Sequence, residues 1–448
     1  MLKKTEAQDR AADLVARAMR AGADAADAVY GASAAISASV RLGALEDVSR
    51  SENGEIGLRI FSGRRSATAS SSDLSTAALD ALVERTLAMA RAAPEDAFAG
   101  LAPETLIARG PFADFDGDDG TDVLPDVLKA RALAAEAAAL DVRGVTNSQG
   151  GSASASRSVT ALATSHGFSA ATTRSGHGVS VSVLAGEGGA QERDYAYHSV
   201  PHLADLDAPE AVGREAGARA VARLNPERLK SGPLPVVFDP RVATSLLAHM
   251  VGAITGGAIA RKTSFLLEAL GTQLFDAGIS IIDDPHRVRG PRSRAYDGEG
   301  LPTAPRTLID KGVLTGWIAE AASARQIGIA PTGHAARGIS GAPGASTTNL
   351  HLAPGSVTPA ALMADIVDGF YVTELIGMGV NGITGDYSRG ASGRRIVRGT
   401  LAGAVSEVTI AGNLKAMFRA LVPADDLVFR QATNAPTLRI DGMTIAGG

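Results

Sequence analysis

The stretch AAISASVRLGALEDVSRSENGEIGLRIFSGRRSATASSS, residues 34–72, decides the fold class of the first half of this chain. Small or apolar residues alternate with polar ones along most of it, which is the period-two pattern of strands with one buried face. The tripeptide Glu52–Asn53–Gly54 interrupts the alternation and predicts a turn. We therefore expect a meander of β-strands here.

Helical patterns flank this meander, and the same order of elements then recurs. The apolar positions at helical spacing are Ala11, Leu14, Val15, Ala18 and Met19 in residues 6–21, and Leu74, Ala78, Leu82 and Leu87 in residues 72–93, where Ser72 or Asp73 would cap the helix. A helix at 123–140, an alternating run at 144–188 and a helix at 208–224 repeat the order. The first half thus predicts one α+β domain of two similar helix–meander–helix halves, with the helices covering one face of an antiparallel sheet.

A domain boundary is expected within residues 225–235, NPERLKSGPLP, where prolines and a glycine follow the end of a helix. Residues 1–230 then form the N-terminal α+β domain, and residues 231–448 form a second domain. In this second domain glycine or proline recurs about every eight to twelve residues between short segments. That rhythm predicts a mostly-β domain that resembles a sandwich or a barrel.

The composition excludes several classes of function. A formal net charge of −5 and an aromatic content of 4% provide neither a basic surface nor a stacking platform for nucleic acid. The chain has no cysteine, which excludes disulfides, Cys-type zinc fingers and a thiol nucleophile. Its N-terminal segment is charged and has no apolar signal core. We expect a soluble, cytoplasmic protein.

One uncharged segment bears on the membrane question. Residues 242–260 contain a GxxxG pair, Gly252 and Gly256, but they also contain a histidine, hydroxyl side chains and further glycine. This segment is too polar and too rich in glycine for a membrane span. We expect a buried helix that ends in a glycine turn.

Two groups of residues were considered as metal ligands. His198 and His202 are four residues apart, but a proline lies between them, which favours two exposed loop histidines over a helical pair. Asp283, Asp284 and His286 are suited to a hard divalent cation. The alternative is an Asp-Pro turn whose carboxylates pair with the neighbouring Arg287 and Arg289.

The segment GITGDYSRGASG, residues 382–393, has a glycine-rich composition that is atypical of a core strand. Ser392 lacks the GxSxG spacing of a nucleophile, and the segment lacks the lysine of a phosphate-binding loop. Glycine leaves the backbone accessible, so that an extended peptide can add to such an edge. We expect a substrate-binding loop, with a purely structural corner as the alternative. Its proposed contact residues are Thr384, Gly385, Asp386, Tyr387, Ser388, Arg389 and Gly390, with Asp386 and Arg389 paired.

Longer stretches carry a resemblance. The most specific are YVTELIGMGVNGITGDYSRGASG (371–393) and VSEVTIAGNLKAMF (405–418). The others are GEIGLRIFSGRR (54–65), VTNSQGG (145–151), VVFDPRVATSLLAHMVGAITGGAIARKTSF (236–265), DDPHRVRG (283–290), DGEGLPT (297–303) and TNLHL (348–352). Together they resemble the TldD/PmbA family, also described as modulators of DNA gyrase, and more narrowly its PmbA/TldE branch.

The resemblance implies a cytosolic, hollow, two-subunit protease that cleaves or trims extended peptides. A TldD-type subunit binds zinc through HExxxH and a further cysteine, whereas the PmbA-type subunit shares the fold and lacks these ligands. Here the corresponding helix reads LLAHMVGAITGG. If the helix is aligned on its glycines, Ala248 and Ala253 occupy the positions of the two histidines. If it is aligned on His249, Met250 occupies the position of the glutamate and Ile254 that of the second histidine. The motif is absent from either alignment.

The chain also departs from this branch after residue 393. Its relatives continue with an aromatic and acidic strand, whereas this chain reads RRIVRGTL. Arg394, Arg395 and Arg398 make the segment basic, which would alter substrate preference or contact with a partner.

We therefore expect a PmbA/TldE-like subunit of a TldD/TldE metalloprotease complex that degrades or matures peptides. This subunit would have no catalytic residue and no metal of its own, and a TldD-like partner would supply zinc. Two alternatives remain open. One is a homodimeric, non-proteolytic regulator that binds peptides or proteins, and the other is an independent hydrolase with a metal at residues 283–286.

Overall fold

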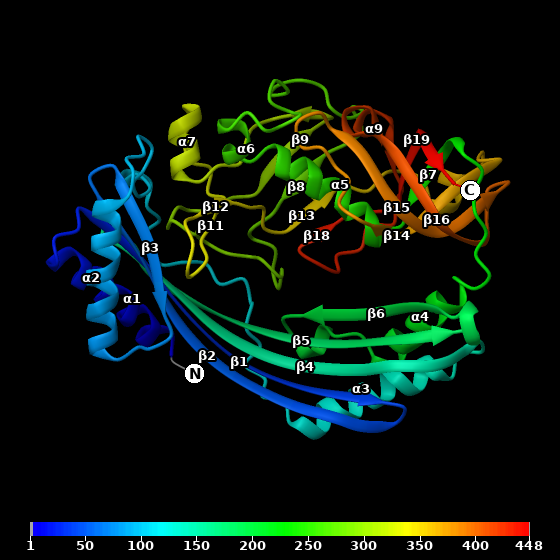
Figure 1. The fold of residues 1–448 in the computed structure, drawn as a ribbon, viewed down its shortest axis with the longest axis horizontal. Coiled ribbons are helices and arrows are strands. Elements are labelled where there is room, and N and C mark those ends of the chain that lie inside the picture. The colour runs from blue at the N-terminus through cyan, green and yellow to red at the C-terminus, as the bar shows by residue number, and fades with distance from the viewer. Residues whose placement is uncertain (1–2, 448) are drawn as a thin grey trace.

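The computed structural model describes residues 3–447, and its first half is one long, curved antiparallel sheet (Figure 1). In spatial order the strands are β3 (Arg65–Ser71), β2 (Ala44–Ser62), β1 (Ala25–Arg41), β4 (Val145–Thr164), β5 (Ser169–Ala185) and β6 (Glu192–Val200). β1 pairs with β4 at the centre, so the two halves of the sequence meet there. β6 lies at one edge of the sheet.

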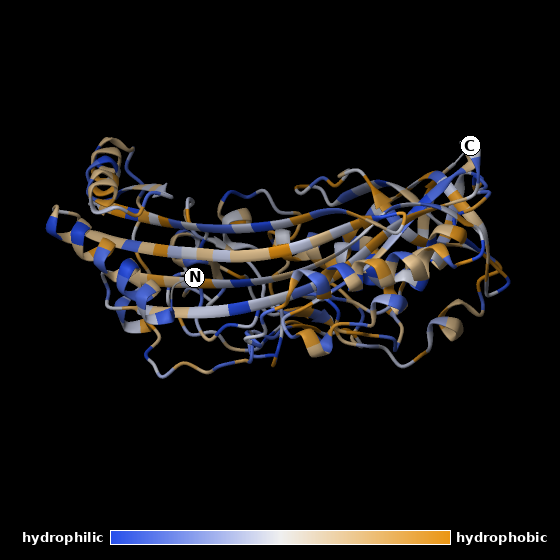
Figure 2. Cartoon of the chain, turned by 90° about the horizontal axis from the view of Figure 1, so that it is seen from below, coloured by the Kyte–Doolittle hydropathy of each residue, from blue (hydrophilic) through white to orange (hydrophobic). Residues whose placement is uncertain are grey.

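Four helices cover one face of this sheet, as the sequence predicted. They are α1 (Lys4–Arg20), α2 (Thr76–Ala92), α3 (Pro125–Leu140) and α4 (Pro209–Val221). Ala28 of β1 is buried with the helices of the first half, and Ala38 of β1 is buried with α3. The two alanines are an even number of residues apart and so share one side of the strand. Figure 2 shows apolar and polar residues mixed along these strands.

The predicted turn at residues 52–54 is wrong, because these residues continue β2. Glu52 lies opposite Ala34 of β1 in regular register. The hairpin instead turns at Leu42 and Gly43, which have φ values of 49° and 78°. Two consecutive positive φ values are the geometry of the two-residue hairpin turn that matches strand twist.

Two helical details also differ from the prediction. Ser75 caps α2 by accepting a hydrogen bond from the amide of Ala78, whereas Asp73 accepts one from the amide of Ser75. Met19 was expected on the buried side of α1 but is 37% exposed, while Ala18 is fully buried.

The second half contains a small closed barrel, which confirms the barrel-like prediction for this part of the chain. Its strands follow the order β16 (Thr400–Asn413), β15 (Asp386–Val397), β14 (Asp368–Ile376), β7 (Gly232–Phe238) and β19 (Leu438–Ala446), and β16 pairs with β19. β17 (Leu421–Pro423) extends the sheet beside β19. Closure leaves few free strand edges.

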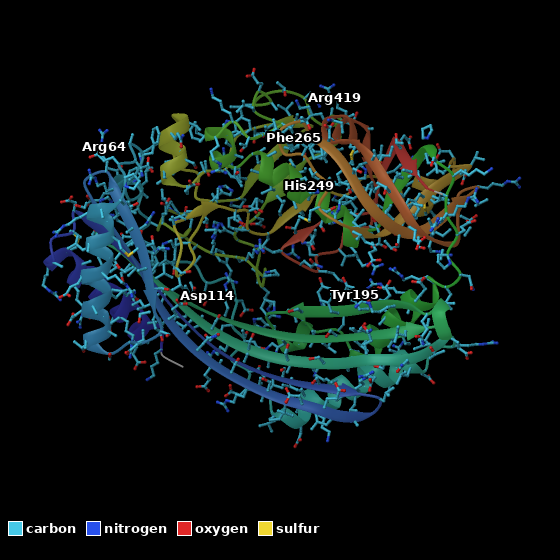
Figure 3. All side chains as sticks on the ribbon, in the orientation of Figure 1. Arg64, Asp114, Tyr195, His249, Phe265 and Arg419 are labelled. Carbon is cyan, nitrogen blue, oxygen red and sulfur yellow. The ribbon has the colours of Figure 1, made fainter. Side chains whose placement is uncertain are left out.

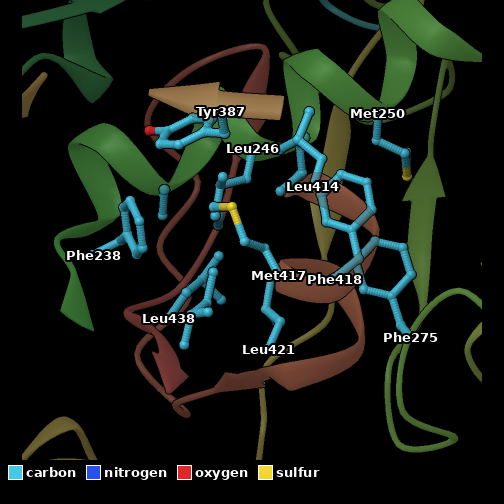
Figure 4. Packing of buried hydrophobic residues seen from close by; sticks show 14 of the residues in the cluster. Phe238, Leu246, Met250, Phe275, Tyr387, Leu414, Met417, Phe418, Leu421 and Leu438 are labelled. Carbon is cyan, nitrogen blue, oxygen red and sulfur yellow. The ribbon is translucent and has the colours of Figure 1, made fainter. Parts of the chain in front are cut away.

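The remaining elements of the second half are short and pack around this barrel. A five-stranded sheet contains β10 (Val313–Leu314), β9 (Arg306–Asp310), β8 (Ile281–Asp283), β13 (Leu350–Leu352) and β18 (Thr433–Asn434), while β11 (Ala335–Ala336) pairs with β12 (Gly344–Ala345). The helices are α5 (Pro240–Ala253), α6 (Gly256–Ala260), α7 (Ala321–Ile327), α8 (Pro359–Met363) and α9 (Leu414–Ala420). Short 3₁₀ helices occur at Glu104–Leu106, Gly188–Ala190 and Leu203–Asp205. Figure 4 shows part of the main apolar core, with residues such as Phe238 and Phe418.

Residues 242–260 form two helices rather than the single helix expected. α5 ends at Ala253, and Thr255 caps α6 by accepting a hydrogen bond from the amide of Ala258. The backbone between them bonds to Ile318, which accepts from Gly256 and donates to Ile254. In the described part of the chain, no helix has the length and apolar character to cross a membrane.

The two halves of the chain are in close contact at one end of the curved sheet. Arg325 of α7 donates hydrogen bonds to the carbonyl oxygens of Phe98, Gly100 and Leu101. At Gly57 of β2, an added Cβ would lie 1.6 Å from the carbonyl oxygen of Ile339, so only glycine fits this approach.

Candidate peptide-binding site

The glycine-rich segment forms a barrel strand for most of its length, contrary to the expectation that its composition excludes a core strand. Residues 386–397 are β15, which pairs with β14 on one side and β16 on the other. At Gly393 an added Cβ would lie 1.9 Å from the carbonyl oxygen of Tyr371 on β14. Glycine here permits a close approach of two strands next to a register shift.

The predicted contact residues divide between the two faces of this strand. Thr384, Asp386 and Ser388 are exposed, Gly385 and Tyr387 are buried, and Arg389 and Gly390 are half-buried. The structure therefore brings these residues into one segment without presenting them on one surface.

The predicted pairing of Asp386 with Arg389 is wrong. Asp386 accepts hydrogen bonds from the hydroxyl of Thr384 at 2.7 Å and from the amide of Asn413 at 3.1 Å. Arg389 donates to the carbonyl oxygen of Leu375 at 3.4 Å. Residues three apart on a strand point to opposite faces, so the charges cannot meet.

The face of β15 that carries Tyr387 meets α5. The helix begins at Pro240 after the cap residue Asp239, whose carboxylate accepts a hydrogen bond from the amide of Arg241 at 2.9 Å. Its buried side chains, including Leu246 and Met250, join the apolar core. His249 lies next to this buried face and is half-buried (Figure 3).

Three buried polar atoms lack a hydrogen bond of good geometry where α5 and β15 adjoin. They are Nε2 of His249, the hydroxyl oxygen of Tyr387 and Nε of Arg389. The rings of His249 and Tyr387 are 6.0 Å apart with an interplanar angle of 77°. Figure 4 shows the hydroxyl end of Tyr387 directed away from the apolar cluster that holds its ring.

The electrostatics of these three groups are consistent with their burial. Burial raises the pKa of Tyr387 to about 12, and the nearby Arg389 guanidinium opposes that rise. Burial lowers the pKa of His249, and the charge of Arg389 lowers it further. At neutral pH the site therefore holds a neutral imidazole, a neutral phenol and one cation.

These residues do not fit the zinc ion that the resemblance associates with this helix. Zinc is held by three or four His, Cys or carboxylate ligands. α5 contains one histidine and no carboxylate, and the guanidinium of Arg389 repels a cation near His249. Within residues 3–447, no group of three or more His, Cys, Asp or Glu side chains is arranged to hold a metal.

Asp283, Asp284 and His286 do not converge on one point. Asp283 is buried and accepts hydrogen bonds from the amide and hydroxyl of Thr348. Asp284 accepts from the amide of His286, whose ring stacks on Phe115 with centroids 4.8 Å apart.

Arg287 and Arg289, the predicted partners of these carboxylates, interact with other residues instead. Arg289 pairs with Asp116 at 2.7 Å and with Asp205 at 3.0 Å. The guanidinium of Arg287 lies 3.5 Å from the ring centroid of Phe429. The segment 283–290 thus ties several loops together.

The two histidines expected to be exposed on a loop are buried. Nδ1 of His198 accepts a hydrogen bond from the amide of Asp207, and Nε2 of His202 lies 2.8 Å from the carbonyl oxygen of Asp116. His198 belongs to the edge strand β6, where alternate side chains point toward α4.

The basic segment after residue 393 is partly used within the chain. Arg394 donates to the carbonyl oxygens of Leu401 and Ala402 in β16. Arg395 pairs with Asp368 at 2.8 Å. Arg398 occupies the turn after β15, with φ of 47°, and is exposed.

A cavity of about 440 Å³ lies between the edge of the curved sheet and the N-terminus of α5. Tyr195 and Tyr197 of β6 line it with stacked rings 6.2 Å apart, and they are 48% and 45% exposed. Arg241 and Thr244 of α5 line the opposite side. Tyr195 and Tyr197 were not predicted from the sequence, although two aromatics at the polar positions of an alternating strand are a usable signal.

A larger hollow of about 600 Å³ lies elsewhere, beside Leu270 and Trp317. Its lining is mainly apolar, with Arg306 as the one charged side chain. It has fewer polar groups to orient a peptide than the cavity at β6.

The fold defines an α+β protein in which a curved antiparallel sheet faces a small closed barrel. The chain matches the descriptions of PmbA/TldA metallopeptidase domain 1 over residues 26–90, the central domain over 118–224 and the C-terminal domain over 231–447. The chain belongs to the PmbA/TldD family.

Full-length similarity to relatives supports this assignment. The Metalloprotease PmbA of Escherichia coli O157:H7 is 37% identical, with 95% of this chain and 92% of that protein covered. A Metalloprotease PmbA homolog of Haemophilus influenzae is 36% identical, with 96% and 94% covered.

Solved structures share the fold. A candidate modulator of DNA gyrase from Bacteroides thetaiotaomicron superimposes with a TM-score of 0.91 at 26% identity, with 99% of each chain covered. TldE from Thermococcus kodakarensis gives a TM-score of 0.87 at 20% identity, with 98% of this chain and all of that chain covered.

Proposed function

We propose that this chain is a PmbA/TldE-like subunit of a cytoplasmic metalloprotease complex. It holds extended peptides, and a TldD-like subunit supplies the zinc that cleaves or matures them. The peptide lies between the curved sheet and the barrel, where the cavity at β6 meets the N-terminus of α5. Of residues 384–390, Tyr387 and Arg389 contribute through the side of β15 that adjoins α5.

The proposal rests mainly on the side chains that α5 presents. The helix presents one imidazole, His249, beside the cationic Arg389. A metallopeptidase needs ligands that fix a cation and a base that activates its bound water. Because α5 supplies neither, we assign catalysis to a partner subunit.

Half-exposed aromatic and amide side chains around the cavity suit a peptide ligand. Tyr195 and Tyr197 are at positions i and i+2 of an edge strand, a spacing that matches alternate side chains of an extended peptide. Gln431 is exposed and adds an amide that can bond to a peptide backbone, whereas the buried Asn434 only holds the backbone of residues 430 and 431 in place. These features support peptide binding in both the protease model and the homodimeric-regulator model.

Co-purification separates the two models. Tagged chain would be expressed with the HExxxH-bearing subunit of its own genome, and the eluate would be assayed with unfolded peptides. The proposal predicts a stable heteromeric complex that cleaves peptides and loses that activity with a chelator. A chain that forms only homodimers while the other subunit elutes alone would favour the regulator.

The proposal also divides the chain into units of residues 1–230 and 231–448. The helix α4 ends before this point, and β7 begins at Gly232 in the barrel. Limited proteolysis tests this division.

A further inference from the structure

The three unpartnered atoms between α5 and β15 are costly to the fold if nothing binds them. A buried donor or acceptor without a partner destabilises the folded state, and native structures contain few such groups. Here His249, Tyr387 and Arg389 each contribute one atom without a hydrogen bond of good geometry. The phenol of Tyr387 has only a weak interaction with the Arg389 side chain, which opposes the rise in its pKa. The clustering of three at one junction points to a ligand that bonds to all of them.

The charge of the site is positive and uncompensated. In the described residues, no carboxylate forms a salt bridge with Arg389. Glu374 on the neighbouring strand β14 pairs instead with Arg223 at 2.7 Å. With His249 and Tyr387 both neutral, the net charge is that of one guanidinium.

A carboxylate matches both the charge and the bonding capacity. It carries one negative charge and has about four lone-pair directions on two oxygens. It can therefore accept from the phenol of Tyr387, the guanidinium of Arg389 and the imidazole of His249. A cation would be repelled by Arg389, and a dianionic phosphate would exceed the single positive charge.

The surface of α5 beside the site is open to solvent. Ala248 is exposed, and a Cβ added to Gly252 would meet no atom within 4 Å. His249 and Arg389 are half-buried, so part of each side chain is in contact with solvent. The unpartnered atoms themselves are covered, and entry of a ligand requires the long Arg389 side chain to swing aside.

We propose that His249, Tyr387 and Arg389 form a binding site for a carboxylate of the peptide substrate. This inference rests on the proposed peptide-binding function. The carboxylate comes either from the C-terminus of the peptide or from an internal Asp or Glu side chain. The site thus holds one end or one acidic side chain of the peptide against α5.

Fluorescence anisotropy on the full chain tests this inference with four N-terminally labelled peptides of one sequence. Two of the peptides have a free C-terminus and two have an amidated C-terminus. In each pair, one peptide contains an internal glutamate and the other does not. We expect at least a tenfold tighter Kd for a peptide that carries the preferred carboxylate than for the uncharged amide. The peptide that shows this gain identifies the source of the carboxylate.

Two variants and two matched controls show whether the gain in affinity from the carboxylate arises at this site. Tyr387→Phe removes only the buried hydroxyl, and Arg389→Gln removes the charge; each should abolish the carboxylate preference. Tyr30→Phe removes the hydroxyl of another buried tyrosine, in the curved sheet, and Arg64→Gln removes an exposed charge. Both controls should retain the preference. Equal binding of all four peptides overturns the carboxylate site and leaves peptide binding intact.

Titration with acetate tests the carboxylate site without a peptide. The imidazole resonance of His249, assigned by its loss in His249→Ala, is followed by NMR during titration with sodium acetate. A saturable shift in the wild type that is absent from Arg389→Gln supports the site even if no peptide binds, in which case only the proposed function fails. The absence of a saturable shift in the wild type, together with equal peptide binding, overturns the site.

Discussion

The ring of Tyr387 on β15 lies 6.0 Å from the imidazole of His249 on α5, at an interplanar angle of 77°. This contact joins the glycine-rich strand to the helix on which TldD-type subunits are expected to carry zinc ligands. In this chain the imidazole meets a phenol and the guanidinium of Arg389. The junction therefore has the chemistry of an anion site.

Gly393 allows β14 to approach β15, so its replacement should disrupt the barrel. Gly393→Ala places a Cβ 1.9 Å from the carbonyl oxygen of Tyr371. We expect a loss of about 3 kcal/mol in the free energy of unfolding, measured by urea denaturation.

Gly252→Ala is the matched control for this prediction. The new Cβ meets no atom within 4 Å in a helical position. Alanine there should stabilise the chain by about 0.5–1 kcal/mol. Similar losses in the two variants would contradict the packing argument.

Glu299 makes stability depend on pH. Burial raises its pKa to about 7, only partly offset by a hydrogen bond from the amide of Ala321 and by the charge of Arg59. The unfolded chain releases this proton near pH 4.5, whereas the folded chain retains it up to about pH 7. The stabilising contribution is therefore complete below about pH 4.5, falls as pH rises and is lost above about pH 7.

Glu299→Gln should remove this dependence, because the amide stays neutral. We expect the variant to be more stable than the wild type at pH 8, by about 1–3 kcal/mol, and nearly equal at pH 5. Thermal denaturation followed by circular dichroism at both pH values measures the difference. A variant that is less stable at pH 8 would mean that the ionised carboxylate is a favourable partner of Arg59.

Arg389 should be needed for peptide turnover more than for folding. In the reconstituted complex, Arg389→Gln is expected to lower kcat/KM by about tenfold or more, because a charge-assisted bond to substrate is lost. Its stability should change by only about 1 kcal/mol, since the residue donates one long hydrogen bond to Leu375. Arg64→Gln, which removes an exposed charge elsewhere, is the control. Wild-type turnover in Arg389→Gln would indicate that β15 has only a structural role.

The proposed boundary near residue 230 should be a site of limited proteolysis. Arg228 and Lys230 are exposed in a segment without regular structure. Brief trypsin treatment should yield two fragments of similar size that still elute together from gel filtration. The bonds from Arg325 to the carbonyl oxygens of Phe98, Gly100 and Leu101 hold them. Rapid cleavage within either half instead would contradict the division.

Much of the fold was predictable because its determinants are local. Alternation in residues 34–72 and 144–188 indicated long strands, and Ala28 and Ala38 lie on the face that the helices cover. The turn was misplaced because Asn53–Gly54 has strong turn character, whereas Leu42–Gly43 does not. The pairing of Glu52 with Ala34 overrides the local preference.

The site was predictable only in part, because it depends on contacts between distant segments. Tyr387 and Arg389 were predicted, but as members of a substrate-binding loop. Barrel closure makes their segment a strand and buries Tyr387, which is 1% exposed. His249 was considered only as a metal ligand, since nothing in the sequence places it beside residues so far along the chain.

The central claim is that this chain binds peptides and depends on another subunit to cleave them. The most direct test assays the purified chain alone, the TldD-like subunit alone and both together on one unfolded peptide, with and without a chelator. The account predicts efficient cleavage only by the mixture, and its loss with the chelator. Chelator-sensitive cleavage by this chain alone would contradict it.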